Sequence, residues 1–97
     1  MRALLALAFL AAAPAAIAAD VMRGANLYRM HCAACHGQNG IAAMPTAPSF
    51  QRGERLMQPD MMLLQSVKTG KNAMPAFIGI LNDREILDVV AYLRTIR

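Results

Sequence analysis

The segment Cys32–His36, which reads CAACH, constrains this chain more than any other feature, because it holds the only two cysteines in 97 residues. A disulfide across so short a loop would remove little chain entropy, so the pair makes a poor structural bridge. The motif alone leaves four uses to be weighed. They are a disulfide, a zinc site, a redox-active dithiol and the covalent attachment of a haem.

The first nineteen residues, MRALLALAFLAAAPAAIAA, have the layout of a secretory signal peptide. Arg2 supplies a short positive start, an apolar run follows from Leu4 to Ala13, and small residues follow Pro14. We expect cleavage before Ala19, and a cut after Ala19 is the second candidate. An uncleaved membrane anchor is the alternative, but the apolar run is shorter than the roughly 20 residues of a spanning helix. Export to the periplasm is therefore expected.

Residues 20–97 are long enough for one small domain and no second one. Loss of Arg2 with the leader leaves nine basic and six acidic side chains, which are scattered along the chain. This mild, dispersed positive charge argues against nucleic acid as a partner. A domain of this size buries little surface and usually needs a further element to complete its core.

Three segments have helical patterning, residues 21–34, 60–69 and 83–96, and no strand signal is convincing. Asp20 is a candidate N-cap of the first, and Asn82 with Glu85 forms a capping-box pattern before the third. Pro59 and Gly70 bound the second, where they act as start and stop signals.

The segment between residues 37 and 58 is long and irregular for so small a domain. Wrapping a cofactor would explain its length.

Cys-x-x-Cys-His in a secreted chain is the pattern of c-type haem attachment. The two thiols can add to the haem vinyl groups, which places His36 under the iron as an axial ligand. Structural zinc needs four ligands, and the only other histidine is His31, which we expect at the surface. A thioredoxin-like dithiol needs a βαβ context, which this pattern lacks. Covalent haem is the favoured interpretation.

A haem iron with a sixth ligand favours electron transfer, whereas an open position favours small-molecule binding. Met74, in the turn-rich segment GKNAMPAF, is the strongest candidate for the sixth ligand. Met44 also precedes a proline but lies only eight residues after His36, so it is a weaker rival. Met61 and Met62 fit core packing better.

Four segments together resemble the class I cytochrome c family, of the short bacterial periplasmic monohaem kind. They are CAACHG at 32–37, APSF at 47–50, AMPAF at 73–77 and VVAYLR at 89–94. The resemblance covers residues 20–97 and implies an all-α fold, with three to four helices and long loops wrapped around one covalent haem c. It also implies a monohaem carrier of single electrons and not an enzyme.

The resemblance implies roles for individual residues. Cys32 and Cys35 would carry the thioether bonds, and His36 and Met74 would be the axial iron ligands. Pro48 would accept a hydrogen bond from His36 through its carbonyl group, which orients the imidazole.

Aromatic residues have implied roles as well. Gly24 and Tyr28 would pack against Tyr92 of the last helix, and Tyr28 would also lie close to the haem. Phe50 and Phe77 are the candidate haem-packing aromatics. Larger members of the family place a tryptophan near a haem propionate. This chain has none, which leaves Arg52, Arg55 or a backbone N–H for that place.

The partners implied are electron donor and acceptor proteins of a respiratory chain, such as a dehydrogenase, an oxidase or a reductase, which would meet the exposed haem edge. Lys68 and Lys71 could form a small basic rim there. A membrane enters only if the leader stays uncleaved. Two alternatives remain: an open-site sensor or haem enzyme, if Met74 does not bind iron, and a bound subunit of a dehydrogenase complex.

Overall fold

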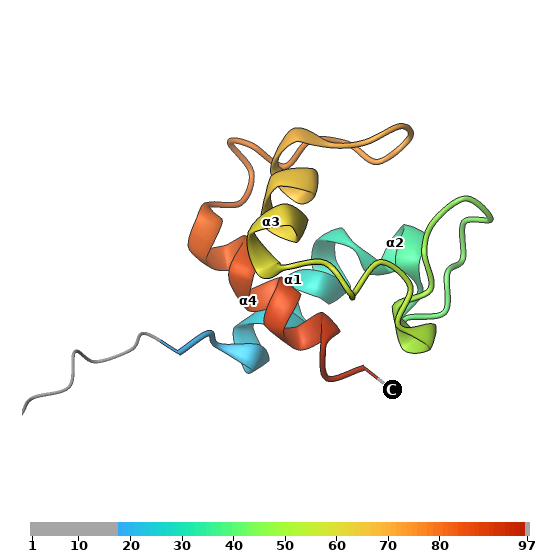
Figure 1. Cartoon of the computed structure of the whole chain (residues 1–97), viewed down its shortest axis with the longest axis horizontal. Helices are drawn as coiled ribbons and strands as arrows, with labels where there is room; N and C mark the ends of the chain where they lie inside the picture. The colour runs from blue at the N-terminus through green and yellow to red at the C-terminus, as the bar shows by residue number, and fades with distance from the viewer. Residues whose placement is uncertain (1–17, 97) are drawn as a thin grey trace, which may run out of the picture.

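The computed structural model describes residues 18–96 (Figure 1). It contains the helices α1 (Val21–His31), α2 (Ala33–His36), α3 (Asp60–Thr69) and α4 (Asp83–Leu93), with one 3-10 turn, η1 (Phe50–Arg52). Within the described residues the only β-type pairing is an isolated bridge between Lys71 and Met74. The expected all-α fold with long loops is confirmed. The expected signal peptide lies almost entirely outside the described residues.

The helix bounds agree with the sequence except at two ends. Helix α3 begins and ends where Pro59 and Gly70 predicted. The first predicted helix is interrupted at Cys32, whose φ of −119° ends α1 before α2 begins. Helix α4 ends at Leu93, three residues early, because the amide of Thr95 bonds to the Tyr92 carbonyl in a tighter turn.

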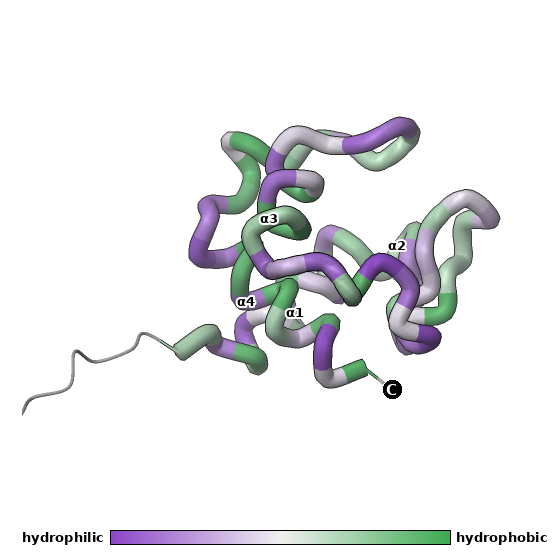
Figure 2. The backbone as a smooth tube through the Cα atoms, in the orientation of Figure 1, coloured by the Kyte–Doolittle hydropathy of each residue, from purple (hydrophilic) through white to green (hydrophobic). Residues whose placement is uncertain are grey.

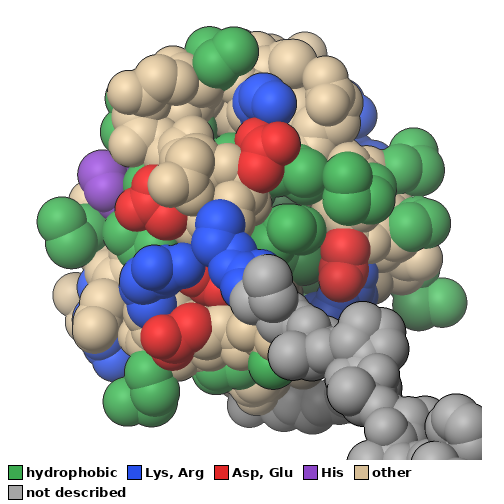
Figure 3. Space-filling view, turned by 90° about the vertical axis from the view of Figure 1, so that its left-hand side faces the viewer, with side chains coloured by type: hydrophobic (Ala, Val, Ile, Leu, Met, Phe, Trp, Pro, Cys, Tyr) green, Lys and Arg blue, Asp and Glu red, His purple; other side chains and the backbone are tan. Residues whose placement is uncertain are grey.

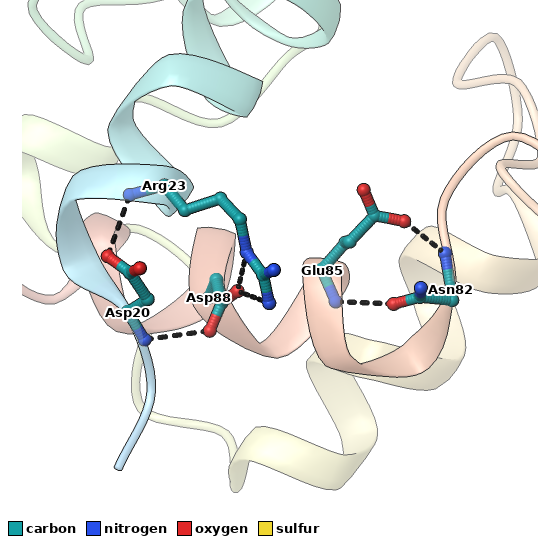
Figure 4. A network of polar contacts seen from close by, with 5 residues as sticks. All are labelled: Asp20, Arg23, Asn82, Glu85 and Asp88. Carbon is teal, nitrogen blue, oxygen red and sulfur yellow. Dashed lines mark hydrogen bonds and ion pairs between the residues drawn. The ribbon is translucent and has the colours of Figure 1, made fainter.

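Both predicted N-caps are present (Figure 4). The carboxylate of Asp20 accepts a hydrogen bond from the Arg23 amide at 2.9 Å. The side chain of Asn82 accepts from the Glu85 amide at 2.8 Å, and the Glu85 carboxylate accepts from the Asn82 amide at 3.0 Å. Such caps satisfy amide groups that a helix leaves without internal partners.

Helices α1 and α4 cross in direct contact, near the centre of Figure 1. Gly24 lies at the crossing, where its missing side chain lets the α1 backbone approach the backbone of Asp88. One turn further along, the rings of Tyr28 and Tyr92 pack with centroids 5.3 Å apart. The expected packing of Tyr28 against Tyr92 is confirmed, whereas Gly24 meets α4 at the backbone of Asp88 and Val89 rather than at Tyr92.

The same crossing holds a charged contact that the sequence did not suggest (Figure 4). The carboxylate of Asp88 is fully buried and accepts hydrogen bonds from the Asp20 amide at 2.8 Å and from the Arg23 guanidinium at 2.6 Å. This carboxylate raises the pKa of Arg23 through their hydrogen bond. Asp88 therefore ties the start of α1 to the middle of α4.

The core consists of two clusters rather than one. The first contains Phe77 with residues of α3, α4 and the loop between them, and Met74 packs against it. The second contains Tyr28, Phe50 and residues of α4, and Cys32 packs against it. Figure 2 shows hydrophobic and hydrophilic segments alternating along the helices, as expected for helices that bury one side.

The end of the long loop is held by Arg94, which follows α4. Its guanidinium donates to the Leu56 carbonyl at 2.6 Å and to the Gln58 carbonyl at 2.8 Å, and it pairs with Asp60 at 2.7 Å. These bonds fix where residues 37–58 rejoin the helices.

On the face shown in Figure 3, basic and acidic side chains are interspersed, with hydrophobic side chains between them. No helix within residues 18–96 has both the length and the apolar character needed to cross a bilayer.

Candidate cofactor site

A pocket lies between the two core clusters. Its lining combines side chains of both clusters with those of the CAACH motif, and apolar groups predominate. The lining residues are Tyr28, Cys32, His36, Phe50, Val67, Met74, Leu81, Ile86, Val89 and Leu93. The structure therefore brings five of the residues singled out in the sequence to one cavity: Tyr28, Cys32, His36, Phe50 and Met74.

His36 ends the short helix α2 and is buried. Its Nδ1 atom lies 3.2 Å from the carbonyl oxygen of Pro48. Because that oxygen can only accept, Nδ1 carries the hydrogen, and the lone pair lies on Nε2. This tautomer leaves Nε2 free to bind a metal ion, and the contact with Pro48 anchors one atom of the ring.

Met74 reaches the pocket from a tight loop after α3. The amide of Lys71 donates to the Met74 carbonyl at 3.1 Å, and the Met74 amide donates to the Lys71 carbonyl at 2.9 Å. Gly70 turns the chain with a φ of +77°, and a side chain there would approach the Met74 carbonyl oxygen at 2.8 Å. The loop backbone is therefore held in place independently of the Met74 side chain.

The two cysteines differ in exposure. Cys32 is half-buried and lines the pocket, whereas Cys35 is exposed and does not line it. Burial, with a smaller contribution from Cys35, raises the pKa of the Cys32 thiol to about 11. The folded environment thus leaves Cys32 protonated at neutral pH.

Tyr28 is fully buried beside His36. Its hydroxyl donates to the Gly37 carbonyl at 2.6 Å, directly after the motif. Burial is the main cause that raises the pKa of Tyr28 to about 12, with smaller contributions from Cys32 and Tyr92. The phenol therefore stays neutral, and its hydrogen bond connects α1 to Gly37 at the end of the motif.

The remaining predicted residues lie in different places. Phe50 lines the pocket and stacks on His36, whereas Phe77 is buried in the first cluster without lining the pocket. His31 was expected at the surface but is half-buried. Its ring and that of Phe77 make a T-shaped contact with centroids 6.0 Å apart. Met44 does not line the pocket.

Part of the pocket lining and of its hydrogen-bonded support could not be predicted from the sequence. Val67 and Leu81 line the cavity, although nothing in their local pattern separates them from ordinary core residues. Ser49 is buried and carries several hydrogen bonds close to Pro48. The only sequence feature that points to Ser49 is its position within the APSF segment at 47–50.

The donor set and the lining fit a covalently attached haem. The cavity lies between the two hydrophobic clusters, where a flat apolar group would contact both of them. The Cys32 thiol, the His36 imidazole and the Met74 thioether line it, and they come from two segments far apart in the sequence. Among residues 18–96 no group of three or more histidine, cysteine or acidic side chains is placed to hold a metal ion.

Comparison with known proteins gives one matching family model, described as cytochrome c oxidase, cbb3-type, subunit III, over residues 19–93. Cytochrome c6 of Thermostichus vulcanus is 41% identical over 87 residues, which is 88% of this chain and 78% of that protein. Cytochrome c6 of Thermosynechococcus vestitus is 43% identical over 82 residues, which is 82% of this chain and 73% of that protein.

A solved structure is also similar. It is cytochrome c6 from the diatom Phaeodactylum tricornutum, with a TM-score of 0.65 and 34% sequence identity. The match covers 76% of this chain and 90% of that one.

Proposed function

This chain belongs to the c-type cytochromes, and we propose that it is a free, exported electron carrier. We propose further that His36 and Met74 are the two axial ligands of its haem iron. The chain binds one covalent haem c and carries electrons between redox partners, and it is not an enzyme. When bound, the haem iron alternates between its ferrous and ferric states and so holds or releases one electron.

One observation supports the axial pair above the others. His36 and Met74 come from segments 38 residues apart, and both line the pocket between the two clusters. Met74 is the only methionine among the lining residues. The attachment chemistry assigns the thioether bonds to Cys32 and Cys35, which precede His36 in the motif.

The protein residues favour fast transfer by holding the site still. Pro48 orients His36, the Lys71–Met74 pairing fixes the backbone beside the thioether, and Tyr28 holds the end of the motif. The apolar lining keeps water away from the iron. Little needs to rearrange when an electron arrives or leaves.

Electron donor and acceptor proteins, such as a dehydrogenase, an oxidase or a reductase, would meet this chain at an exposed haem edge. The proposed basic rim is weaker than its sequence suggests, because Lys68 pairs with Asp83 at 3.0 Å. Lys71 is exposed and takes part in none of the ion pairs found among the described residues. One cation near the loop of Met74 suits a weak, transient encounter.

The proposed location is the periplasm, reached by means of the signal peptide in residues 1–19. Its support is the leader pattern before Asp20. Sequencing the N-terminus of the exported protein tests this. A first residue of Ala19 or Asp20 supports it, and an intact leader on the mature protein contradicts it.

A bound subunit is the second candidate, because the matching family model is named for an oxidase subunit. The relatives that match over most of their length are named cytochrome c6. Gel filtration of a mildly prepared periplasmic extract separates the two. A carrier elutes near its own mass, whereas a subunit elutes with a large partner.

The visible absorption spectrum tests the axial ligands. We expect a low-spin c-type spectrum with the weak far-red band of ferric methionine–haem ligation, and no change of the ferrous spectrum on adding carbon monoxide. A high-spin spectrum that shifts with carbon monoxide would contradict Met74 ligation. It would favour the open-site sensor or haem enzyme instead.

A further inference from the structure

We propose that Phe50 is a positioning residue that fixes the plane of the His36 imidazole, and that Ser49 and Glu54 hold Phe50 in place. The inference rests on the proposed role of His36 as an axial ligand. It goes beyond that role by assigning the orientation of the ligand to side chains outside the motif.

The rings of Phe50 and His36 are stacked. Their centroids lie 4.5 Å apart and their planes differ by 25°. Both side chains are buried, with 8% and 7% of their surface exposed. Stacking at this distance is attractive, and it restricts how far either ring can tilt.

The stack supplies a restraint that the Pro48 carbonyl cannot. The hydrogen bond from Nδ1 fixes one atom of the His36 ring, about which the ring can still pivot. A flat neighbour against the face of the ring blocks that pivot. The two contacts together define the imidazole plane, and the orientation of an axial ligand is one means by which a protein tunes a metal.

Phe50 is itself supported on its other side. Its ring meets Tyr28 edge-on, with centroids 6.5 Å apart and planes at 64°. Tyr28 is fully buried and bonded to Gly37, the residue directly after His36. Phe50 thus lies between a fixed ring and the ligand.

Ser49 lies between Pro48 and Phe50, and its hydrogen bonds fix the backbone position of both neighbours. Its amide donates to the Glu54 carboxylate at 2.7 Å, and its hydroxyl accepts from the Ala42 amide at 2.9 Å. Its carbonyl accepts from the Glu54 amide at 3.3 Å. A residue held at its amide, hydroxyl and carbonyl leaves its two neighbours little freedom.

The segment that holds Ser49 is also hydrogen-bonded to the attachment motif. The amides of Ala43 and Met44 donate to the Cys35 carbonyl at 3.0 Å each, next to Ala42, which holds Ser49. The chain from Cys35 to Glu54 therefore forms a hydrogen-bonded loop. This loop begins at Cys35, next to His36, and it brings the Phe50 ring against the face of the His36 ring.

The experiment compares Phe50→Leu with Phe77→Leu in the exported, haem-loaded protein. Phe77 is a matched control, because it is equally buried at 7% but contacts His31 rather than His36. The readouts are the haem-methyl resonances in the paramagnetic NMR spectrum and the EPR g-values of the ferric protein. Both respond to the planes of the axial ligands, and the far-red band reports methionine ligation separately.

We expect Phe50→Leu to change the order or the spread of the haem-methyl resonances and the g-values while the far-red band remains. Phe77→Leu should leave the histidine-dependent pattern unchanged. Equal spectra for Phe50→Leu and the wild type would overturn the inference and leave the proposed function standing.

A second pair of variants avoids the pocket. Glu54 is exposed, so Glu54→Ala removes the acceptor of the Ser49 amide without touching the core. We expect a smaller shift in the same direction as for Phe50→Leu, and Glu54→Gln should restore the wild-type pattern because its amide oxygen still accepts. No shift in Glu54→Ala overturns the role of Glu54. A wild type that lacks histidine–methionine ligation overturns the proposed function and this inference together.

Discussion

Gly24 of α1 and Asp88 of α4 are in backbone contact. A Cβ atom on Gly24 would lie 2.5 Å from the carbonyl carbon of Asp88 and 3.0 Å from the amide nitrogen of Val89. Both are main-chain atoms inside a helix, so neither can turn aside as a side chain would. The absence of one carbon atom therefore sets how closely the two helices cross.

The first prediction concerns this crossing. Gly24→Ala should lower the free energy of unfolding by about 3 kcal/mol or more, because the overlap can be relieved only by moving a helix. Denaturation of the haem-loaded protein with guanidinium measures it. Gly53→Ala is the control, since a Cβ there would meet nothing within 4 Å, although its φ of +77° adds some backbone strain. Equal losses for the two variants would contradict the packing argument.

The second prediction concerns the buried carboxylate of Asp88. Asp88→Asn should cost about 1–3 kcal/mol of stability, the range for a lost partner of a buried polar group, without altering the visible spectrum. Asp83→Asn breaks the exposed pair with Lys68 and should cost less than about 1 kcal/mol. Thermal unfolding of both variants checks the contrast. A larger loss for Asp83→Asn would show that the Asp88 contact is not the stronger one.

The third prediction concerns Met74. Met74→Ala should abolish the far-red band, open the iron to carbon monoxide and lower the reduction potential, because the thioether favours the ferrous state. Met57→Ala is the matched control, since that side chain is 96% exposed and outside the pocket. Titration with carbon monoxide and redox potentiometry supply the measurements. A far-red band that survives Met74→Ala would assign the ligand to another residue.

The fourth prediction concerns loss of the cofactor. A Cys32→Ala, Cys35→Ala double variant made without haem should lose most of its helical circular dichroism, because the two core clusters then lack the apolar group between them. The far-ultraviolet spectrum of the haem-loaded wild type is the reference. Near-native helical signal in the haem-free variant would contradict the prediction.

The fifth prediction concerns alkaline stability. The unfolded chain loses the Tyr28 proton near pH 10, whereas the folded chain keeps it until about pH 12. Folding stability should therefore fall as the pH rises from about 10 to about 12, by roughly 3 kcal/mol at most for this one group. Tyr28→Phe should remove that part of the decline. Urea unfolding at several pH values measures it, with Tyr92→Phe as a variant that retains Tyr28 and should keep the decline.

The parts of the fold that depend on neighbouring residues could be predicted from the sequence. Pro59, Gly70 and the Asn82–Glu85 capping pair act over a few residues, and the helices at these points begin or end as expected. The break at Cys32 could not be found, because the helical face of the first segment continues through it. It is a local change of backbone direction with no proline or glycine to mark it.

Contacts between distant segments could be inferred only in part. Gly24 was identified because a glycine inside a helical face needs a reason, and the resemblance supplied Tyr92. The Asp88 contact spans 68 residues, and an acidic residue on α4 reads as a surface group until α1 is placed against it. Phe50 and Phe77 have similar local surroundings in sequence, and only the fold shows that Phe50 alone reaches the pocket.

The burial of Cys32 has a consequence for the order in which this protein is assembled. The thiolate is the reactive form of a cysteine, and a pKa of about 11 leaves very little of it at neutral pH. A chain that folded first would present a poor nucleophile in a crowded cavity. If Cys32 carries a thioether bond as proposed, we expect the haem to be attached before the helices close, because the folded chain half-buries this thiol among the pocket side chains.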